Sequence, residues 1–342
     1  MKKCYPKNSH ILFKEYLSFD DVLIKPHFSG ITLKEIDLST NVLGKFDLKI
    51  PIIASSMDTV CGWEMAVALG KLGGLGIIHR NQSIESQANE VKKVLKKEVI
   101  VGAAVGLSND FENRVKALTK TGANIICLDY SIGHSKCAIE AAKHIRNKYH
   151  CEVISGNITT REAIRDYLKN NIRIFRYGIS NSPICISQQI SGVGVPLFSA
   201  LLDIKFFSLK ENIFLIADGG IRTSGDIVKA LAAGAHAVML GSMLAGTKES
   251  PGKMINIKGK LYKQYRGMGS LSAIQKGSGD RYNQLDFNSI HPEGTETFLE
   301  YKGAVKNVID DIVYGIKSAM LKIGAKNLSE LKHNAEFIKI KR

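Results

Sequence analysis

The residue best suited to covalent chemistry is Cys185, which lies within segment 177–196, YGISNSPICISQQISGVGVP. The segment has no regular apolar period, is marked by glycine and proline, and follows a strand-like run at 172–175. Long irregular loops after buried strands are where α/β proteins place their chemistry. A thiol there is a candidate nucleophile. The alternative is that Cys185 is an inert thiol buried in an apolar loop.

A second set of polar residues and glycines stands directly after short apolar runs. Two acids, an amide and several glycines suit a polar ligand site, because glycine lets backbone N–H groups approach an anion such as phosphate. Taken singly, each is better explained as a turn glycine or a helix cap, but the set as a whole is not. The members of the set are Ser55, His79, Asp129, Asn157, Gly178, Asp218, Gly219, Gly220, Gly241 and Ser242.

Eight short apolar runs, rich in β-branched residues, predict fully buried parallel strands. Eight such units in succession predict an α/β fold of the (β/α)8 barrel type. A doubly wound sheet is the alternative, and the lack of a GxGxxG after the first strand weakens it. The runs are 51–54, 75–78, 99–105, 124–128, 152–155, 172–175, 213–217 and 237–240. Helical patterns separate most of them, at 63–72, 84–97, 111–118, 136–146, 160–168 and 224–233, and the cysteine loop separates 172–175 from 213–217.

Such a barrel carries its chemistry at the C-terminal ends of the strands, so it would gather the polar set and the cysteine loop on one rim. We expect residues 1–342 to form one catalytic domain, with an arm and lead-in at 1–50. Residues 253–300 contain the Gly-rich stretches YRGMGS and KGSGDRY, which predict a mobile flap inserted after the eighth strand. Residues 305–342 supply an amphipathic closing helix and a tail.

Composition limits the classes of partner. The formal net charge is +15, but no basic segment carries interleaved aromatics, so the charge predicts a solvated surface or attraction for an anionic nucleotide, and no nucleic-acid binding. Six cysteines form no CxxC pair and no zinc-like spacing with histidine, which predicts reduced thiols. We find no signal peptide and no membrane-spanning apolar run, so we expect a soluble cytoplasmic protein without a membrane partner.

These residues together resemble the family of IMP dehydrogenases and GMP reductases, from Ser18 to about Ile340. As a set, the matching segments are highly specific. They are SFDDVLIKP (18–26), PIIASSMDTV (51–60), GGLGIIHRN (73–81), VGAAVG (101–106), GNITT (156–160), SGVGVP (191–196), IADGGIRTSGDI (216–227), VMLGSMLAGTKESPG (238–252), YRGMGSLSA (265–273), GSGDRY (277–282), PEG (292–294) and YKG (301–303).

The resemblance implies an NAD-dependent oxidoreductase of purine biosynthesis that converts inosine monophosphate to xanthosine monophosphate, in guanine nucleotide synthesis. It implies that Cys185 attacks purine C2, that hydride leaves for NAD, and that a covalent thioimidate remains. The flap then brings in Arg281 and Tyr282 to activate water. Covalent catalysis splits one hard reaction into two easier steps. A moving flap separates hydride transfer, which needs a dry site, from hydrolysis, which needs water.

The resemblance also implies the other site residues. Ser187 stands where the family has a threonine near the cysteine, and it joins the catalytic candidates. Asp129 and Asn157 match positions near the nicotinamide. The positions that match the nucleotide site, which would hold a purine nucleoside monophosphate, are Ser55, Met57, Asp218, Gly219, Gly220, Gly241, Ser242, Tyr265, Gly267, Met268, Gly269 and Glu293.

The cysteine loop departs from the family. The family sequence GIGPGSIC is GISNSPIC here, so Ser180 and Ser182 replace glycines that would tolerate positive φ. Pro183 replaces the serine that touches the substrate phosphate, and it lacks both a hydroxyl and an N–H. In the family, backbone carbonyls of this loop hold a potassium ion, which here would fall to Gly178, Ser180 and Cys185.

Within the family, YRGMGS and the Arg281-Tyr282 pair are dehydrogenase features. Arg80 replaces a lysine that is catalytic in reductases, and arginine does not readily release a proton. The regulatory module of paired cystathionine-synthase-type (CBS) domains is absent, as it is in reductases and in a minority of dehydrogenases. The alternatives are an NADPH-dependent GMP reductase or purine paralogue, and a nucleotide-binding relative that has lost turnover. Family members are homotetramers, so we expect a homotetramer.

Overall fold

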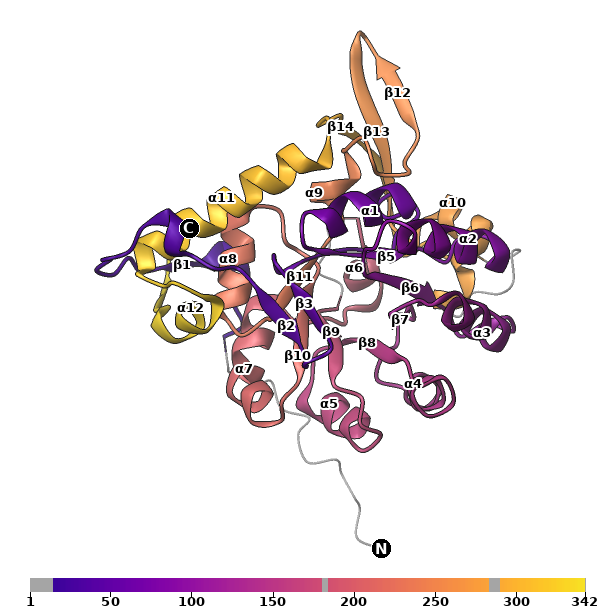
Figure 1. Cartoon of the computed structure of the whole chain (residues 1–342), viewed down its shortest axis with the longest axis horizontal. Helices are drawn as coiled ribbons and strands as arrows, with labels where there is room; N and C mark the ends of the chain where they lie inside the picture. The colour runs from indigo at the N-terminus through magenta and orange to yellow at the C-terminus, as the bar shows by residue number, and fades with distance from the viewer. Residues whose placement is uncertain (1–14, 180–183, 283–289, 342) are drawn as a thin grey trace, which may run out of the picture.

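Eight short strands, buried on both faces, close into a barrel in the computed structural model, which describes residues 15–179, 184–282 and 290–341. All neighbours are parallel, and the ring runs β10-β11-β4-β5-β6-β7-β8-β9 (Figure 1). This confirms the predicted (β/α)8 barrel and excludes the doubly wound sheet. The strands are β4 (Ile52–Ala54), β5 (Leu75–Ile78), β6 (Val101–Val105), β7 (Ile125–Leu128), β8 (Glu152–Ile158), β9 (Ile174–Tyr177), β10 (Phe214–Asp218) and β11 (Ala237–Leu240).

Helices follow the strands and surround the barrel (Figure 1). Several begin where the sequence indicates, because the side chains of Ser83, Thr160 and Thr223 each accept a hydrogen bond from the backbone N–H three positions later. These caps satisfy N–H groups that the first turn of a helix leaves unpaired. The helices are α1 (Trp63–Lys71), α2 (Ile84–Leu95), α3 (Phe111–Thr121), α4 (Lys136–Tyr149), α5 (Arg161–Leu168), α7 (Leu197–Lys210), α8 (Ser224–Ala232) and α11 (Val305–Ile323).

The helical content between β9 and β10 corrects the interpretation of this region as one long loop. A short helix α6 (Ser187–Ser191) follows the cysteine, and α7 then packs against the barrel. The sequence hides α7 because its apolar residues are not confined to one face. Phe206 and Leu209 are exposed, whereas Phe198 and Leu201 are buried. A helix that is apolar on more than one side lacks the single stripe by which a surface helix is recognised.

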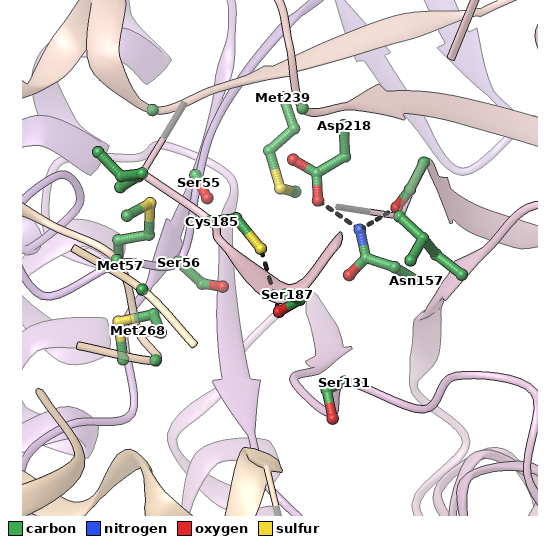
Figure 2. Close-up of a pocket in the computed structure, with 18 of the residues that line it drawn as sticks. Ser55, Ser56, Met57, Ser131, Asn157, Cys185, Ser187, Asp218, Met239 and Met268 are labelled. Atoms are coloured by element: carbon green, nitrogen blue, oxygen red, sulfur yellow. Dashed lines mark hydrogen bonds between the residues drawn. The ribbon is translucent and has the colours of Figure 1, made fainter. Parts of the chain in front are cut away.

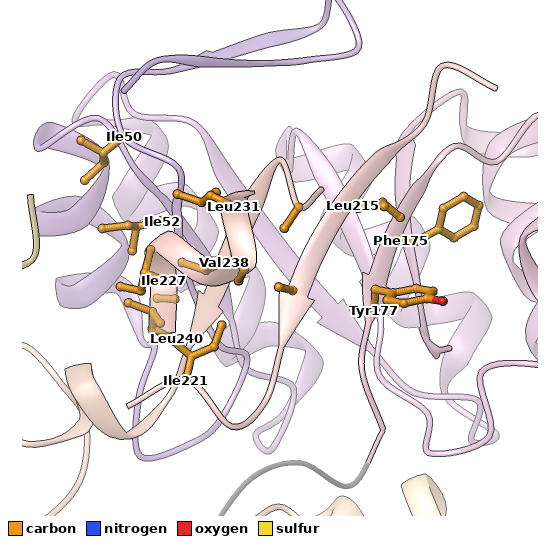
Figure 3. Packing of buried hydrophobic residues seen from close by; sticks show 14 of the residues in the cluster. Ile50, Ile52, Phe175, Tyr177, Leu215, Ile221, Ile227, Leu231, Val238 and Leu240 are labelled. Carbon is orange, nitrogen blue, oxygen red and sulfur yellow. The ribbon is translucent and has the colours of Figure 1, made fainter. Parts of the chain in front are cut away.

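The apolar core has two parts. Inside the barrel, Ile77, Ile154 and Phe214 pack together with Val42 and Leu48 of the hairpin formed by β2 (Thr40–Val42) and β3 (Phe46–Leu48). Between the strands and the outer helices lies the larger part, which includes buried side chains of β9, β10, β11 and α8 (Figure 3). Since the hairpin's apolar residues join the barrel interior, we infer that it covers the N-terminal end and leaves the opposite end for ligands.

Residues 253–300 divide into two structural parts. The first is an antiparallel sheet of β12 (Met254–Ile257), β13 (Lys260–Arg266) and β14 (Glu296–Glu300), whose β12–β13 hairpin projects away from the barrel (Figure 1). The second contains α10 (Leu271–Ala273) and helical turns at Ile274–Ser278 and Gly279–Tyr282. Regular strands thus account for part of the range in which a flap is expected, and the mobility of this range stays a prediction.

The segments near the two ends of the described chain pair with each other. Strand β1 (Val22–Ile24) runs antiparallel to β15 (Phe337–Lys339), and α12 (Leu328–Asn334) lies just before β15. Among the described residues, no helix combines the length and apolarity needed to cross a bilayer.

Candidate active site

One pocket opens at the C-terminal ends of the barrel strands, and most of the predicted site residues line it (Figure 2). Ser55 after β4, Cys185 in the loop after β9 and Asp218 at the end of β10 all face the same space. The gathering on one rim is what the barrel predicts. The predicted residues that line the pocket are Ser55, Met57, Asn157, Gly178, Cys185, Ser187, Asp218, Gly219, Gly220, Gly241, Ser242, Tyr265, Gly267, Met268, Gly269, Arg281, Tyr282 and Glu293.

Cys185 is held by the chain segment that leads into β14. The N–H of Ile186 donates to the carbonyl of Glu293 at 3.0 Å, and the N–H of Thr295 donates to the carbonyl of Ile184 at 2.9 Å. The half-buried thiol of Cys185 donates to Ser187 Oγ at 3.3 Å. Backbone bonds on both sides thus fix the thiol at the pocket wall, next to a hydroxyl that can accept its proton.

Asp218 is fixed by two neighbours. Arg176 donates to Asp218 Oδ2 from Nε at 3.0 Å and from Nη2 at 2.8 Å, and Asn157 Nδ2 donates to the same oxygen at 2.7 Å. Burial lowers the pKa of Arg176, but Asp218 and Cys127 together more than offset this, so the pKa is raised and the guanidinium stays charged. Among the described residues, these bonds leave Asp218 Oδ1 for a ligand.

Asn157 is the predicted cofactor residue that reaches the pocket. Its Nδ2 also donates to the carbonyl of Gly178 at 2.8 Å, while its Oδ1 is buried and accepts no hydrogen bond from any described residue. A buried acceptor without a partner is costly unless a ligand satisfies it. An amide N–H, such as that of a nicotinamide carboxamide, suits this position.

Asp129, the other predicted cofactor residue, does not line the pocket. It is completely buried, and three arginines surround its carboxylate. Arg80 Nε lies 3.2 Å from Oδ2, Arg176 Nη1 lies 3.4 Å from Oδ1, and Arg281 Nη1 also contacts Oδ1. Arg281, which lines the pocket, thus lies directly against Asp129, which does not.

Arg281 and Tyr282 bring the flap segment to the pocket. The carbonyl of Arg281 accepts hydrogen bonds from Ser131 N at 3.1 Å and from Ser131 Oγ at 2.7 Å. Burial raises the pKa of Tyr282, although the neighbouring Arg281 opposes the rise. The phenol is therefore protonated at neutral pH and acts as a hydrogen-bonding group.

The expected potassium site, made of backbone carbonyls, stays a prediction because only part of it falls within the described residues. Ser180 lies outside them, together with Ser182 and Pro183. The Gly178 carbonyl already accepts a hydrogen bond from Asn157. Within the described ranges, no group of three His, Cys, Asp or Glu side chains is arranged to hold a metal ion. We therefore derive no catalytic step through a cation.

Sequence reasoning missed Arg176 and Ser131, and it placed His79 on the rim. Arg176 stands inside the apolar run that forms β9, and a charged residue in a buried strand is the signal that could have found it. Nothing in the sequence marked Ser131. His79 follows β5 as expected but is buried beside Asp58 and does not line the pocket.

Known proteins resemble the chain over almost its whole length. The family described as the IMP dehydrogenase / GMP reductase domain matches residues 16–342. The inosine-5'-monophosphate dehydrogenase of Borreliella burgdorferi is 38% identical over 96% of this chain and 94% of the relative. The protein of that name from Cryptosporidium parvum is 39% identical over 95% of this chain and 92% of the relative. The protein of that name from Halalkalibacterium halodurans is 33% identical over 96% of this chain and 94% of the relative.

The alignment with the Halalkalibacterium halodurans protein spans 454 positions, many more than the 342 residues of this chain, so that relative carries internal segments with no counterpart here. The match nevertheless extends over the barrel, the cysteine loop and the flap segment. The chain therefore belongs to the IMP dehydrogenase / GMP reductase family.

Proposed function

We propose that the chain is an NAD-dependent IMP dehydrogenase, which oxidises inosine monophosphate to xanthosine monophosphate. The observation that carries this proposal is a single pocket lined by the Cys185 thiol, the Asp218 carboxylate and the Arg281-Tyr282 pair. The relatives named above are all called dehydrogenases, in agreement with the oxidoreductase predicted from the sequence.

The pocket offers suitable groups for each part of the nucleotide. Asp218 Oδ1 would accept hydrogen bonds from ribose hydroxyls, since Oδ2 is already used. The glycines at 219, 220 and 241 let the backbone approach the phosphate closely. The thioethers of Met57 and Met268 line the same space and suit the flat faces of a purine (Figure 2).

The first step forms a bond between Cys185 Sγ and purine C2. The thiol proton passes to Ser187 Oγ and on to solvent as the sulfur attacks, and C2 then loses its hydrogen as hydride. NAD, when bound, supplies the chemistry of this step by accepting that hydride. Asn157 would orient the carboxamide through its unpaired Oδ1. The product of the step on this chain is a covalent thioimidate.

The second step releases xanthosine monophosphate. Water, activated by Arg281 and Tyr282, adds across the C2=N3 bond of the thioimidate. One of its protons stays on N3 and the other passes to solvent, while the C2–S bond breaks to return the Cys185 thiolate. The protonated Tyr282 phenol orients the water, while Arg281 adds positive charge to the pocket in which the thiolate forms. The thiolate is then reprotonated, so the cysteine is regenerated in each cycle.

A GMP reductase is the second candidate because the matching family contains both activities. Against it, Arg80 contacts both Asp129 and Asp280, so it is paired as well as being a poor proton donor. A nucleotide-binding relative without turnover would have no need of Cys185, Asp218, Arg281 and Tyr282 in one pocket. A homotetramer, a cytoplasmic location and a bound potassium ion remain proposals that rest on the resemblance.

One assay separates the three candidates. The purified chain is mixed with inosine monophosphate and NAD, or with guanosine monophosphate and NADPH, and the absorbance of the reduced nicotinamide is followed. A rise in the first mixture is expected. A fall in the second would refute the dehydrogenase. Unchanged absorbance in both mixtures, with nucleotide binding still seen by calorimetry, would point to the nucleotide-binding relative without turnover.

A further inference from the structure

We propose that Arg80 is a positioning residue that holds the segment Gly279–Tyr282 over the pocket through Asp280, and that it thereby sets the rate of hydrolysis relative to hydride transfer. The inference rests on the proposed function, because this segment carries the two residues assigned to the hydrolysis step. Arg80 follows β5 and belongs to the barrel, whereas Asp280 lies next to Arg281 on the flap.

A single guanidinium bridges the barrel and the flap. Arg80 Nη2 lies 2.8 Å from Asp280 Oδ1, and Arg80 Nε lies 3.2 Å from Asp129 Oδ2. The three side chains are almost completely enclosed, with 5% of Arg80, 9% of Asp280 and none of Asp129 exposed. The planar fork of arginine can contact two carboxylates at once, which the point charge of lysine cannot do in the same way.

The contact between Arg80 and Asp280, which we call the latch, suits a flap segment that must open. No described residue gives either Asp280 oxygen a well-aligned hydrogen bond, so the pairing with Arg80 is one of charge and proximity. Charges attract strongly when water is excluded and weakly once water enters. The latch therefore holds while the segment is seated, and it weakens as soon as the segment lifts and Asp280 is hydrated.

Gly106, directly after β6, lies against both side chains of the latch. A methyl group at this position would lie 2.4 Å from Asp280 Oδ2 and 2.7 Å from Arg80 Cζ. Gly106 is not among the glycines with positive φ, so its backbone would accept alanine and the obstacle is the latch itself. Gly106→Ala should therefore displace the pair without changing any charge.

Replacement of Arg80 leaves the other charged side chains around Asp129 paired with it. Asp129 keeps its contact with Arg176 when the segment lifts and its contact with Arg281 while the segment is seated, so Arg80→Gln does not strand the completely buried carboxylate. Asp280 alone loses its partner, and it can recover solvation by leaving the pocket. Because Asp280 loses its partner and Asp129 does not, we expect Arg80→Gln to open the flap segment while the barrel stays folded.

The first test measures hydrogen exchange of peptides covering 271–282 and needs no turnover. Arg80→Gln, Asp280→Asn and Gly106→Ala should each speed exchange in this segment, and the Arg80→Gln/Asp280→Asn double variant should exchange no faster than the faster single variant. Arg146→Gln, which removes an ion pair with Glu152 at the start of β8, and Gly225→Ala, which adds a methyl in ordinary contact only, are matched controls that should leave exchange unchanged.

The second test mixes each variant rapidly with inosine monophosphate and NAD. The NADH burst, which reports hydride transfer, should keep its rate, while steady-state turnover should fall about tenfold, equivalent to about 1.4 kcal/mol. Arg80→Lys should restore part of the turnover because it keeps the charge. If Arg80→Gln does not fold, Asp280→Asn and Gly106→Ala carry the same comparison.

Three results would overturn the latch: unchanged exchange in Arg80→Gln and Gly106→Ala, additive effects in the double variant, or equal slowing of burst and turnover. The proposed function fails differently. If the unmodified chain forms no NADH, the dehydrogenase assignment is lost, while the exchange experiment still decides whether Arg80 holds the segment down.

Discussion

Arg176 and Asp218 face each other from neighbouring strands, and two nitrogens of the arginine donate to a single oxygen of the carboxylate, at 3.0 and 2.8 Å. The second carboxylate oxygen is thereby left on the pocket side (Figure 2). The orientation of Asp218, the proposed ribose-binding group, thus depends on Arg176, which is 3% exposed.

We expect Arg176→Gln to raise KM for inosine monophosphate by about tenfold or more, because hydrogen bonds to a charged group are worth about 1.5–3 kcal/mol. The limiting kcat should fall less, since the thiol and the flap segment are untouched. Arg173→Gln, just before the same strand, is the control. An unchanged KM accompanied by lower thermal stability would mean that Arg176 has a structural role alone.

Removal of the thiol should abolish turnover. Cys185→Ala is expected to lower kcat by at least about 10⁴-fold, as the loss of a catalytic nucleophile typically does. Binding of inosine monophosphate, measured by calorimetry, should persist because Asp218 keeps both of its partners. Cys151→Ala is a control, because burial raises the pKa of that thiol to about 11 and keeps it protonated. A much smaller fall in kcat for Cys185→Ala would refute the covalent mechanism.

Gly178 should be intolerant of alanine. Its φ is +136°, and a methyl group would lie 2.2 Å from the carbonyl oxygen of Asp218. Strained backbone of this kind costs about 1–3 kcal/mol, so Gly178→Ala should lower the free energy of unfolding in urea by about that amount or more. Gly192 also has positive φ but has open space around it. Gly192→Ala should be milder, and equal effects would show that the close approach at Gly178 is unimportant.

His79 should make the free energy of unfolding depend on pH. Burial lowers the pKa of His79 to about 4, and Lys276, Arg266 and Arg114 add to the fall while Asp58 opposes it. An unfolded histidine titrates near 6.5. Between about pH 6.5 and 4 the unfolded chain binds the additional proton, so the folded state loses up to about 1.4 kcal/mol per pH unit as the pH falls through this window.

The measurement is urea unfolding at several pH values for the unmodified chain and for His79→Gln. The difference in unfolding free energy between the two should shrink or reverse as the pH falls from about 6.5 to about 4, the window set by the folded and unfolded pKa values. Carboxylates that titrate at low pH affect both proteins and cancel in the comparison. Parallel curves across this range would show that His79 is not the group responsible.

The barrel could be predicted because its strands are buried on both faces and therefore read as short apolar runs. The predicted run 237–240 matches β11 without a shift, and 75–78 matches β5. The starts of the helices could also be predicted from the local sequence, because Thr160 and Thr223 cap the helices that follow them. These features depend on neighbours in the sequence.

The pairing of charges around Asp129 could not be predicted in the same way. Its partners Arg80, Arg176 and Arg281 come from three separate parts of the chain, and their contacts depend on how the strands and the flap meet. A family resemblance named Asp129 as a cofactor residue but did not reveal that an arginine of the flap would stand against it. Likewise, α7 was missed because its apolar residues lie on more than one side.

The pairing of β4 with β11, which joins Ile52 to Val238, has a consequence for biosynthesis. At about 5–20 residues per second, ribosomes would expose the first of these strands roughly 10–40 seconds before its partner. During that interval one edge of β4 has no neighbour, although all its side chains are buried in the finished protein. Unpaired apolar edges invite aggregation. Nascent chains of this protein should therefore depend on chaperones until residue 240 has emerged.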